Sequence, residues 1–181
     1  MAERGREAFE REVLVHLDAA YGFARRLAGS PDDAADIVQE ACLRAWRAYG
    51  EFRDGSAKTW LLTITRNTAF SWLGAARRYQ PTVLDHDDLA PFDPSALPVD
   101  PEAMLRRIED RALLDRLVQG LPQAYREVLI LRELEELSYR EIATVIAAPL
   151  GTVMSRLARA RQALQEGWRQ SQVEGTHGLR R

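Results

Sequence analysis

Four side chains that can donate hydrogen bonds lie close together near the C-terminal end of the sequence: Thr152, Ser155, Arg156 and Arg159. Apolar residues recur among them at i, i+4, i+7 and i+11, starting at Val153. A helix here must turn those apolar residues inward, which leaves the four polar side chains on its outer face. Hydroxyl and guanidinium groups on such a face can bind phosphates and read base edges in a groove. A helical hairpin with solvated arginines is the alternative at this point.

The preceding residues would position this helix. Ser138 and Glu141 have the spacing of a capping box, which opens a short helix, and Ala148-Pro149 then breaks the chain. Residues 137–164 therefore have the pattern of a helix-turn-helix, whose second helix, expected over residues 150–165, presents its first residues to base edges.

A second group with binding chemistry lies at residues 55–78. This stretch contains Lys58, Arg66, Arg77 and Arg78 and no acidic residue, with Trp60, Phe70 and Trp72 among them. Positive charge follows a phosphate backbone and aromatic faces stack on unpaired bases, so the composition suits single-stranded nucleic acid. Tryptophans in a small helical domain are also common core residues, so we expect Trp60 or Trp72 to be at least partly buried.

Two helices are expected before this segment. Apolar spacing predicts one helix over residues 7–28, ended by Gly29, and Ser30-Pro31 with Asp32-Asp33 predicts the start of another that runs to about Tyr49. On the second helix, Leu43 lies among polar residues on faces other than the core face. We interpret this as a partner-binding surface, with a simple solvated surface as the alternative. Its members are Asp36, Gln39, Glu40, Leu43 and Arg44.

Charge and proline content divide the chain of 181 residues. Residues 1–78 carry twelve basic and eleven acidic side chains, and residues 103–181 carry thirteen basic and ten acidic ones. Residues 79–102 carry six acidic side chains and no basic one. Five of the eight prolines also lie in the middle stretch. We therefore predict an all-α protein of two small helical domains, 1–78 and 103–170, joined by a flexible acidic linker, 79–102, and followed by a tail, 171–181. The C-terminal domain contains the helix-turn-helix.

Several classes of protein are disfavoured. The one cysteine, Cys42, cannot form an internal disulfide, and the three histidines lack ligand spacing, so we expect no metal and no cofactor. No apolar run approaches 18 residues and the N-terminus is charged, which argues against membrane insertion and secretion and favours the cytoplasm. Phosphate-binding loops and nucleophile motifs are absent from the sequence, so we expect no enzyme.

Four segments, taken together in this order, resemble the extracytoplasmic-function (ECF) sigma factors of bacterial RNA polymerase. They are DIVQEACLRAW at 36–46, FRDGS at 52–56, TWLLTITRN at 59–67, and Leu121-Pro122 leading into REVLILRELEELSYREIA at 126–143. The resemblance spans roughly residues 8–170. It implies a sigma region 2 domain followed by a region 4 domain, and a role in transcription initiation through core RNA polymerase.

The resemblance also implies roles for the residues above. The partner-binding surface around Leu43 would bind the clamp of core polymerase. The loop at 50–57 and the helix after it would hold the single-stranded −10 element, with a flipped base in a pocket. The residues nominated for −10 binding are Phe52, Ser56, Trp60, Arg66 and Asn67.

The second helix of the helix-turn-helix would read duplex DNA at the −35 element through Thr152, Ser155, Arg156 and Arg159, with Arg161 as a phosphate contact. This sequence has Met154 where family members often carry lysine or arginine, so the −35 preference is expected to differ. The acidic linker would run toward the polymerase active site, although solubility alone also explains its charge. An anti-sigma protein is a further partner that the resemblance admits.

Two other classes of function remain open from the sequence. A stand-alone helix-turn-helix regulator would need a sensor or dimerisation domain in residues 1–78 and would bind DNA without polymerase. The net charge of −2 argues against strong autonomous binding. An enzyme with an appended DNA-binding domain would need catalytic residues that the sequence does not show.

Overall fold

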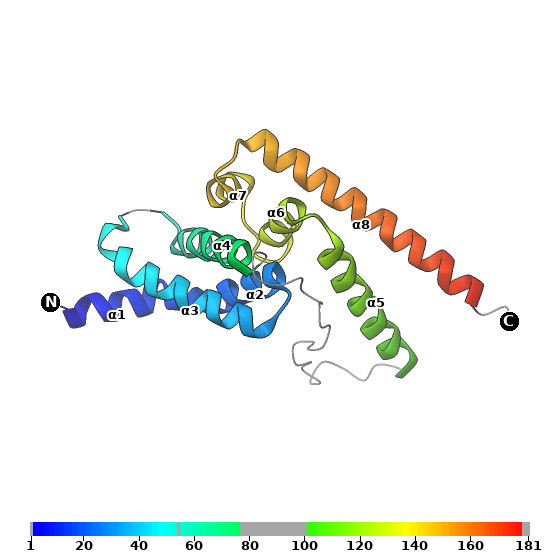
Figure 1. The fold of residues 1–181 in the computed structure, drawn as a ribbon, viewed down its shortest axis with the longest axis horizontal. Helices are drawn as coiled ribbons and strands as arrows, with labels where there is room; N and C mark the ends of the chain where they lie inside the picture. Colours follow the sequence, from blue (N-terminus) through cyan, green and yellow to red (C-terminus); the bar gives the residue numbers. More distant parts are fainter. Residues whose placement is uncertain (1, 54, 77–100, 179–181) are drawn as a thin grey trace.

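The computed structural model describes residues 2–53, 55–76 and 101–178, and every regular element within them is a helix (Figure 1). The N-terminal domain contains α1 (Ala2–Glu12), η1 (Leu14–His16), α2 (Leu17–Ala28), α3 (Pro31–Ala48), η2 (Tyr49–Glu51) and α4 (Ala57–Ala76). The C-terminal domain contains α5 (Pro101–Gly120), α6 (Gln123–Glu133), α7 (Tyr139–Ile146) and α8 (Leu150–Gly178). The all-α class is confirmed. The predicted linker falls outside the described residues, except for its last two residues, which begin α5.

The N-terminal domain is built on α2, α3 and α4, each of which packs against the other two. Gly29 ends α2 in the left-handed conformation at φ 80°, where a glycine avoids the strain of a side chain. Ser30 then caps α3, because its Oγ accepts a hydrogen bond from the Asp33 N–H at 3.3 Å. Phe23, Ile37 and Leu61 are fully buried between the three helices.

The single helix predicted over residues 7–28 is wrong, because the chain breaks between α1 and α2. Residues 14–16 form a turn of 3-10 helix, and Val13 before it is completely buried. The break lets Phe9 pack edge-on against Trp46 and Tyr49, with ring centroids 5.1 and 5.2 Å apart. Apolar spacing did not reveal the break because the residues on both sides of it remain in contact with the same core.

The C-terminal domain contains the predicted helix-turn-helix. Ser138 Oγ accepts from the Glu141 N–H at 3.3 Å while the Glu141 carboxylate accepts from the Ser138 N–H at 2.8 Å, which completes the capping box. Ala147 ends α7 at φ 50°. The apolar spacing of the next helix is also confirmed, since Val153, Leu157 and Ala160 are buried. That helix, α8, continues to Gly178, well beyond its predicted end at residue 165, and diverges from α5 to form a V (Figure 1).

The two domains lie directly against each other. Helix α4 packs against α7 and α2 packs against α6 (Figure 1). Buried residues of both domains, such as Leu61 and Ile142, belong to one continuous hydrophobic cluster. Within the described residues, no single helix is long and apolar enough to cross a membrane. One pair of helices, α7 with α8 as far as Ser171, has a length and composition that could span a membrane, and the two helices meet at a bend of 100°.

Candidate nucleic-acid interface

The predicted partner-binding surface lies along the solvent side of α3. Asp36, Gln39, Leu43 and Arg44 are exposed, and Leu43 has 45% of its surface accessible. Glu40 is partly buried and accepts a hydrogen bond of 2.8 Å from Arg44 Nε. The exposed leucine lies beside this surface ion pair, so this side of α3 is available to another molecule. Trp46, one turn further along α3, is also exposed, with 43% of its surface accessible.

Three of the five residues nominated for −10 binding lie together at the start of α4. Phe52 and Trp60 are partly buried, with ring centroids 4.9 Å apart, and Phe52 also stacks on Tyr49 at 6.4 Å. Ser56 Oγ accepts from the Thr59 N–H at 3.2 Å and so supports the first turn of α4. The loop and the helix therefore present a row of three partly buried aromatic rings.

The other two nominated residues lie further along α4 and differ in their surroundings. Asn67 is exposed, seven residues after Trp60 and therefore on the same side of the helix. Arg66 points toward the C-terminal domain, where its Nε is 2.7 Å and its Nη2 3.4 Å from the Glu127 carboxylate. Its guanidinium also lies 4.4 Å from the centre of the Phe70 ring. In this conformation the Asn67 side chain is accessible to a ligand, whereas the Arg66 guanidinium is already bound to Glu127.

The outer side of α8 carries the residues nominated for −35 binding. Ser155 and Arg159 are exposed, and Thr152 is partly buried. Arg161 is exposed and forms an ion pair of 2.7 Å with Glu133, which screening by water makes weak. Met154 is 53% exposed beside them, so an apolar side chain occupies the outer surface at this turn.

Arg156 differs from its neighbours because a buried carboxylate holds it. Its Nη1 lies 3.1 Å from Glu127 Oε1, and only 30% of its side chain is exposed. Glu127, on α6, has a side chain that is 2% exposed and binds both Arg66 and Arg156. One carboxylate therefore holds one arginine nominated for −10 binding and one nominated for −35 binding.

The contacts that join the two domains are not evident from the sequence. Lys58 Nζ is 3.0 Å from the Glu135 carboxylate and donates to the Glu135 carbonyl at 2.9 Å. Thr59 Oγ1 donates to Glu141 at 3.3 Å. The hydrogen bonds from Ser138, with smaller effects of Thr59 and Lys58, lower the pKa of Glu141. The partners are separated by 77 and 82 residues, so no local pattern in the sequence could have paired them.

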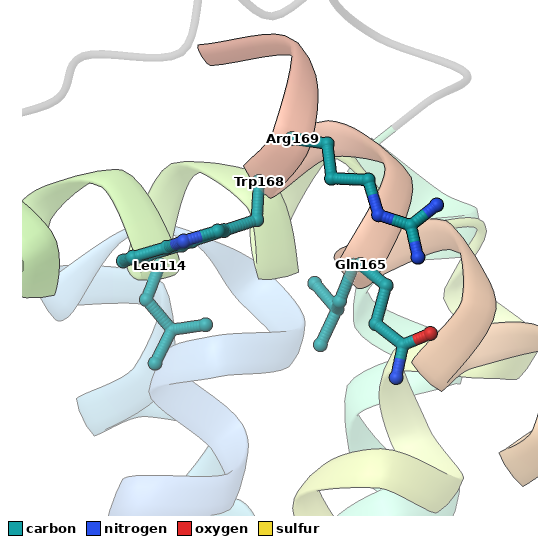
Figure 2. Close-up of a pocket in the computed structure, with 5 residues that line it drawn as sticks. Leu114, Gln165, Trp168 and Arg169 are labelled. Carbon is teal, nitrogen blue, oxygen red and sulfur yellow. The ribbon is translucent and has the colours of Figure 1, made fainter. Parts of the chain in front are cut away.

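A hollow of about 450 Å³ opens between α5 and α8, away from these surfaces. Figure 2 shows Trp168 and Leu114 side by side in its wall, with Gln165 and Arg169 beside them. None of the nominated residues lines it. Within the described parts of the chain, no group of three or more His, Cys, Asp or Glu side chains is placed to hold a metal ion.

Known proteins resemble both domains. The family model for Sigma-70 region 2 matches residues 13–79 and that for Sigma-70, region 4 matches residues 111–164. The RNA polymerase sigma-H factor of Pseudomonas aeruginosa PAO1 is 39% identical over 170 residues, which cover 91% of this chain and 88% of that protein. The ECF RNA polymerase sigma-E factor of Escherichia coli K12 is 39% identical over 137 residues, or 73% and 72% of the two chains.

Solved structures share the fold across both domains. The sigma factor RpoE from Bartonella quintana, in complex with the anti-sigma factor NepR, superposes with a TM-score of 0.73 at 28% identity, over 89% of this chain and 96% of that one. CnrH, in complex with the cytosolic domain of CnrY, superposes with a TM-score of 0.62 at 23% identity, over 89% of this chain and 87% of that one. The similarity therefore extends over both helical domains in the same order.

Proposed function

Since this chain belongs to the extracytoplasmic-function sigma factors of the sigma-70 family, and so directs core RNA polymerase to promoters, we propose that its two domains divide promoter recognition. The observation that carries this proposal is the presence of region 2 and region 4 in one chain, in that order. A stand-alone regulator is not favoured, because region 2 occupies the residues where a sensor or dimerisation domain would have to lie.

The N-terminal domain binds the melted −10 element. The rings of Phe52 and Trp60, supported by Ser56, offer an aromatic surface on which an unpaired base can stack. Asn67, exposed on the same side of α4, offers a donor and an acceptor to the edge of such a base. Arg66 joins this surface once its contact with Glu127 is released.

The C-terminal domain places the start of α8 in the major groove at the −35 element. Thr152, Ser155 and Arg159 supply contacts to base edges and phosphates, and Arg161, further along, contacts a phosphate. Arg156 contributes a base contact when it leaves Glu127. Met154, exposed between them, brings an apolar contact where a charged side chain would bind phosphate.

Core polymerase binds the outer side of α3 around Leu43, where apolar surface is already exposed. An anti-sigma protein is a further partner, supported by the RpoE structure, in which such a protein is bound to a chain 28% identical to this one. The chain acts in the cytoplasm with polymerase and has no catalytic activity of its own.

A gel-shift experiment with a promoter fragment tests this function. Labelled duplex promoter DNA is mixed with the chain alone, with core polymerase alone and with both. The proposed function predicts a sequence-specific complex that needs both proteins. A complex of equal strength and specificity with the chain alone would instead support a stand-alone regulator.

A further inference from the structure

A continuous series of ring contacts joins helix α1 to the start of α4. Phe9 of α1 packs edge-on against Tyr49, with ring centroids 5.2 Å apart. Tyr49 stacks on Phe52 at 6.4 Å with 19° between the planes, and Phe52 lies 4.9 Å from Trp60. The last two rings belong to the surface proposed for the −10 element, whereas Phe9 and Tyr49 lie behind it. The −10 surface is therefore supported from α1.

A hydrogen bond fixes the ring in the middle of this series. The Tyr49 hydroxyl donates to Glu12 Oε2, at the end of α1, over 2.8 Å. Partial burial of Tyr49, and then its hydrogen bond to Glu12, raise the pKa of the phenol, so the hydroxyl stays protonated and able to donate at neutral pH. A ring that is packed by Phe9 and bonded through its hydroxyl cannot change rotamer without breaking both contacts.

The position of Tyr49 is passed on to Phe52 by backbone and side chain together. Residues 49–51 form a turn of 3-10 helix, in which the Phe52 N–H donates to the Tyr49 carbonyl at 3.1 Å. The Phe52 ring then lies on the face of the Tyr49 ring. Because ordering a side chain during binding costs free energy, a ring that is already in place binds an unpaired base more tightly.

Glu12 has no comparable role in the stability of the domain. Its side chain is 45% exposed, so its hydrogen bond competes with water and contributes little to the free energy of unfolding. Its carboxylate would also repel the phosphate backbone of DNA, which argues against a direct contact. The effect of Glu12 on DNA binding must therefore come through the Tyr49 ring.

We propose that Tyr49, held by Glu12 of α1, is a positioning residue for the −10 element: it orients Phe52 so that the rings of Phe52 and Trp60 receive the unpaired base. This inference rests on the proposed function, which assigns Phe52 and Trp60 to −10 DNA. It adds α1 and the turn after α3 to the parts of the chain on which that recognition depends.

Affinity for a fork-junction template tests this role. The template is duplex through the −35 element and single-stranded on the non-template strand at −10, and the full chain binds it together with core polymerase. Tyr49→Phe, which keeps the ring and removes the hydroxyl, should weaken binding on the order of fivefold. Glu12→Ala should weaken it by the same factor. The double variant should weaken it no further, because both substitutions remove one hydrogen bond.

Matched controls separate positioning from general damage. Glu12→Gln keeps an oxygen that can accept from Tyr49, so it should bind the fork as the unsubstituted chain does. Glu10→Ala removes another exposed carboxylate of α1, one that pairs with Arg6 and not with the rings, and should have no effect. Binding to duplex DNA that contains the −35 element and lacks the −10 element should be unchanged in every variant, as should the melting temperature.

A signal from Trp60 reports the ring geometry without DNA. The full chain is prepared with 5-fluorotryptophan, and the Trp60 resonance in the fluorine NMR spectrum is assigned by its loss in Trp60→Phe. Tyr49→Phe and Glu12→Ala should shift and broaden this resonance, because the Phe52 ring beside it becomes free to move. Glu12→Gln and Glu10→Ala should leave it in place.

Two results would overturn the inference: a Trp60 resonance that is insensitive to both Tyr49→Phe and Glu12→Ala, or fork binding that neither variant weakens although Trp60→Ala does. Failure of the proposed function gives a different result. In that case Phe52→Ala and Trp60→Ala would themselves leave the fork affinity unchanged, or no complex would form with core polymerase, and the inference would fall with it.

Discussion

Because Leu43 is exposed, we expect its replacement to impair binding to a partner rather than folding. With 45% of its surface accessible, its truncation removes little buried area, so Leu43→Ala should change the free energy of unfolding by less than about 0.5 kcal/mol. If it lies at the centre of the polymerase contact, affinity for core polymerase should fall by about tenfold. Fluorescence anisotropy and thermal melting measure the two effects.

Val15→Ala is the matched control, because Val15 is 64% exposed on the same domain but outside α3. It should leave both affinity and melting temperature near those of the unsubstituted chain. A Leu43→Ala protein that melts early and still binds polymerase normally would mean that Leu43 serves the fold.

Asn67 is exposed on α4, so its role can be separated from stability. Asn67→Ala should leave the closed complex on duplex promoter largely intact and lower the yield of open complex several-fold, because a captured base helps only once the strands part. Permanganate reactivity of unpaired thymines reports that yield. Ser71→Ala, one turn further along α4, is the control. Normal opening with an unchanged −10 preference would show that the base pocket lies elsewhere.

Replacing Met154 by arginine is expected to strengthen DNA binding rather than weaken it. Its side chain is 53% exposed on α8, so Met154→Arg can place a guanidinium beside DNA without disturbing the core. Binding of the polymerase complex to −35 duplexes should strengthen, and the slope of log affinity against log salt should steepen by about one unit. An unchanged slope would place residue 154 away from the backbone.

At the scale of helices, the capping box of α7 links stability to pH. The hydrogen bonds from Ser138 hold the pKa of Glu141 below its unfolded value, which is about 4.3. The ionised carboxylate therefore contributes stability that is fully present above that unfolded value and is lost as pH falls through the lower folded value. Ser138→Ala should cost about 1 kcal/mol near neutral pH.

Glu141→Gln isolates this effect, because the amide can still accept a hydrogen bond but does not titrate. The difference in unfolding free energy between the unsubstituted chain and Glu141→Gln should be constant above about pH 5 and shrink below about pH 4. Urea titrations at each pH measure the difference. A difference that does not change with pH would contradict the lowered pKa.

The starts of helices are the features that the sequence predicts most accurately. Ser30-Pro31 and the pair Ser138 and Glu141 act through neighbours three residues away, so their hydrogen bonds could be read from the sequence and are present in the structure. The break at residues 14–16 was missed, because it depends on how Phe9 packs against α3. Local chemistry therefore predicts where a helix begins better than where tertiary packing interrupts it.

At the scale of the whole molecule, the sequence predicted both classes of helical domain but not the contact between them. The sequence and its family resemblance assign Arg66 and Arg156 to DNA, and the structure ties both to Glu127, 61 and 29 residues away. The pairing depends on how two domains pack, which neither periodicity nor capping records. A buried carboxylate on α6 was the missing partner.

As a member of the sigma factor family, this chain makes core RNA polymerase initiate at specific promoters. Transcription in vitro from fragmented genomic DNA of the source organism, with and without the chain, followed by mapping of transcript 5′ ends, tests it most directly. We predict discrete start sites that appear only when the chain is added and that share −10 and −35 elements. Start sites that are the same with core polymerase alone, or no new ones with the chain, would contradict the claim.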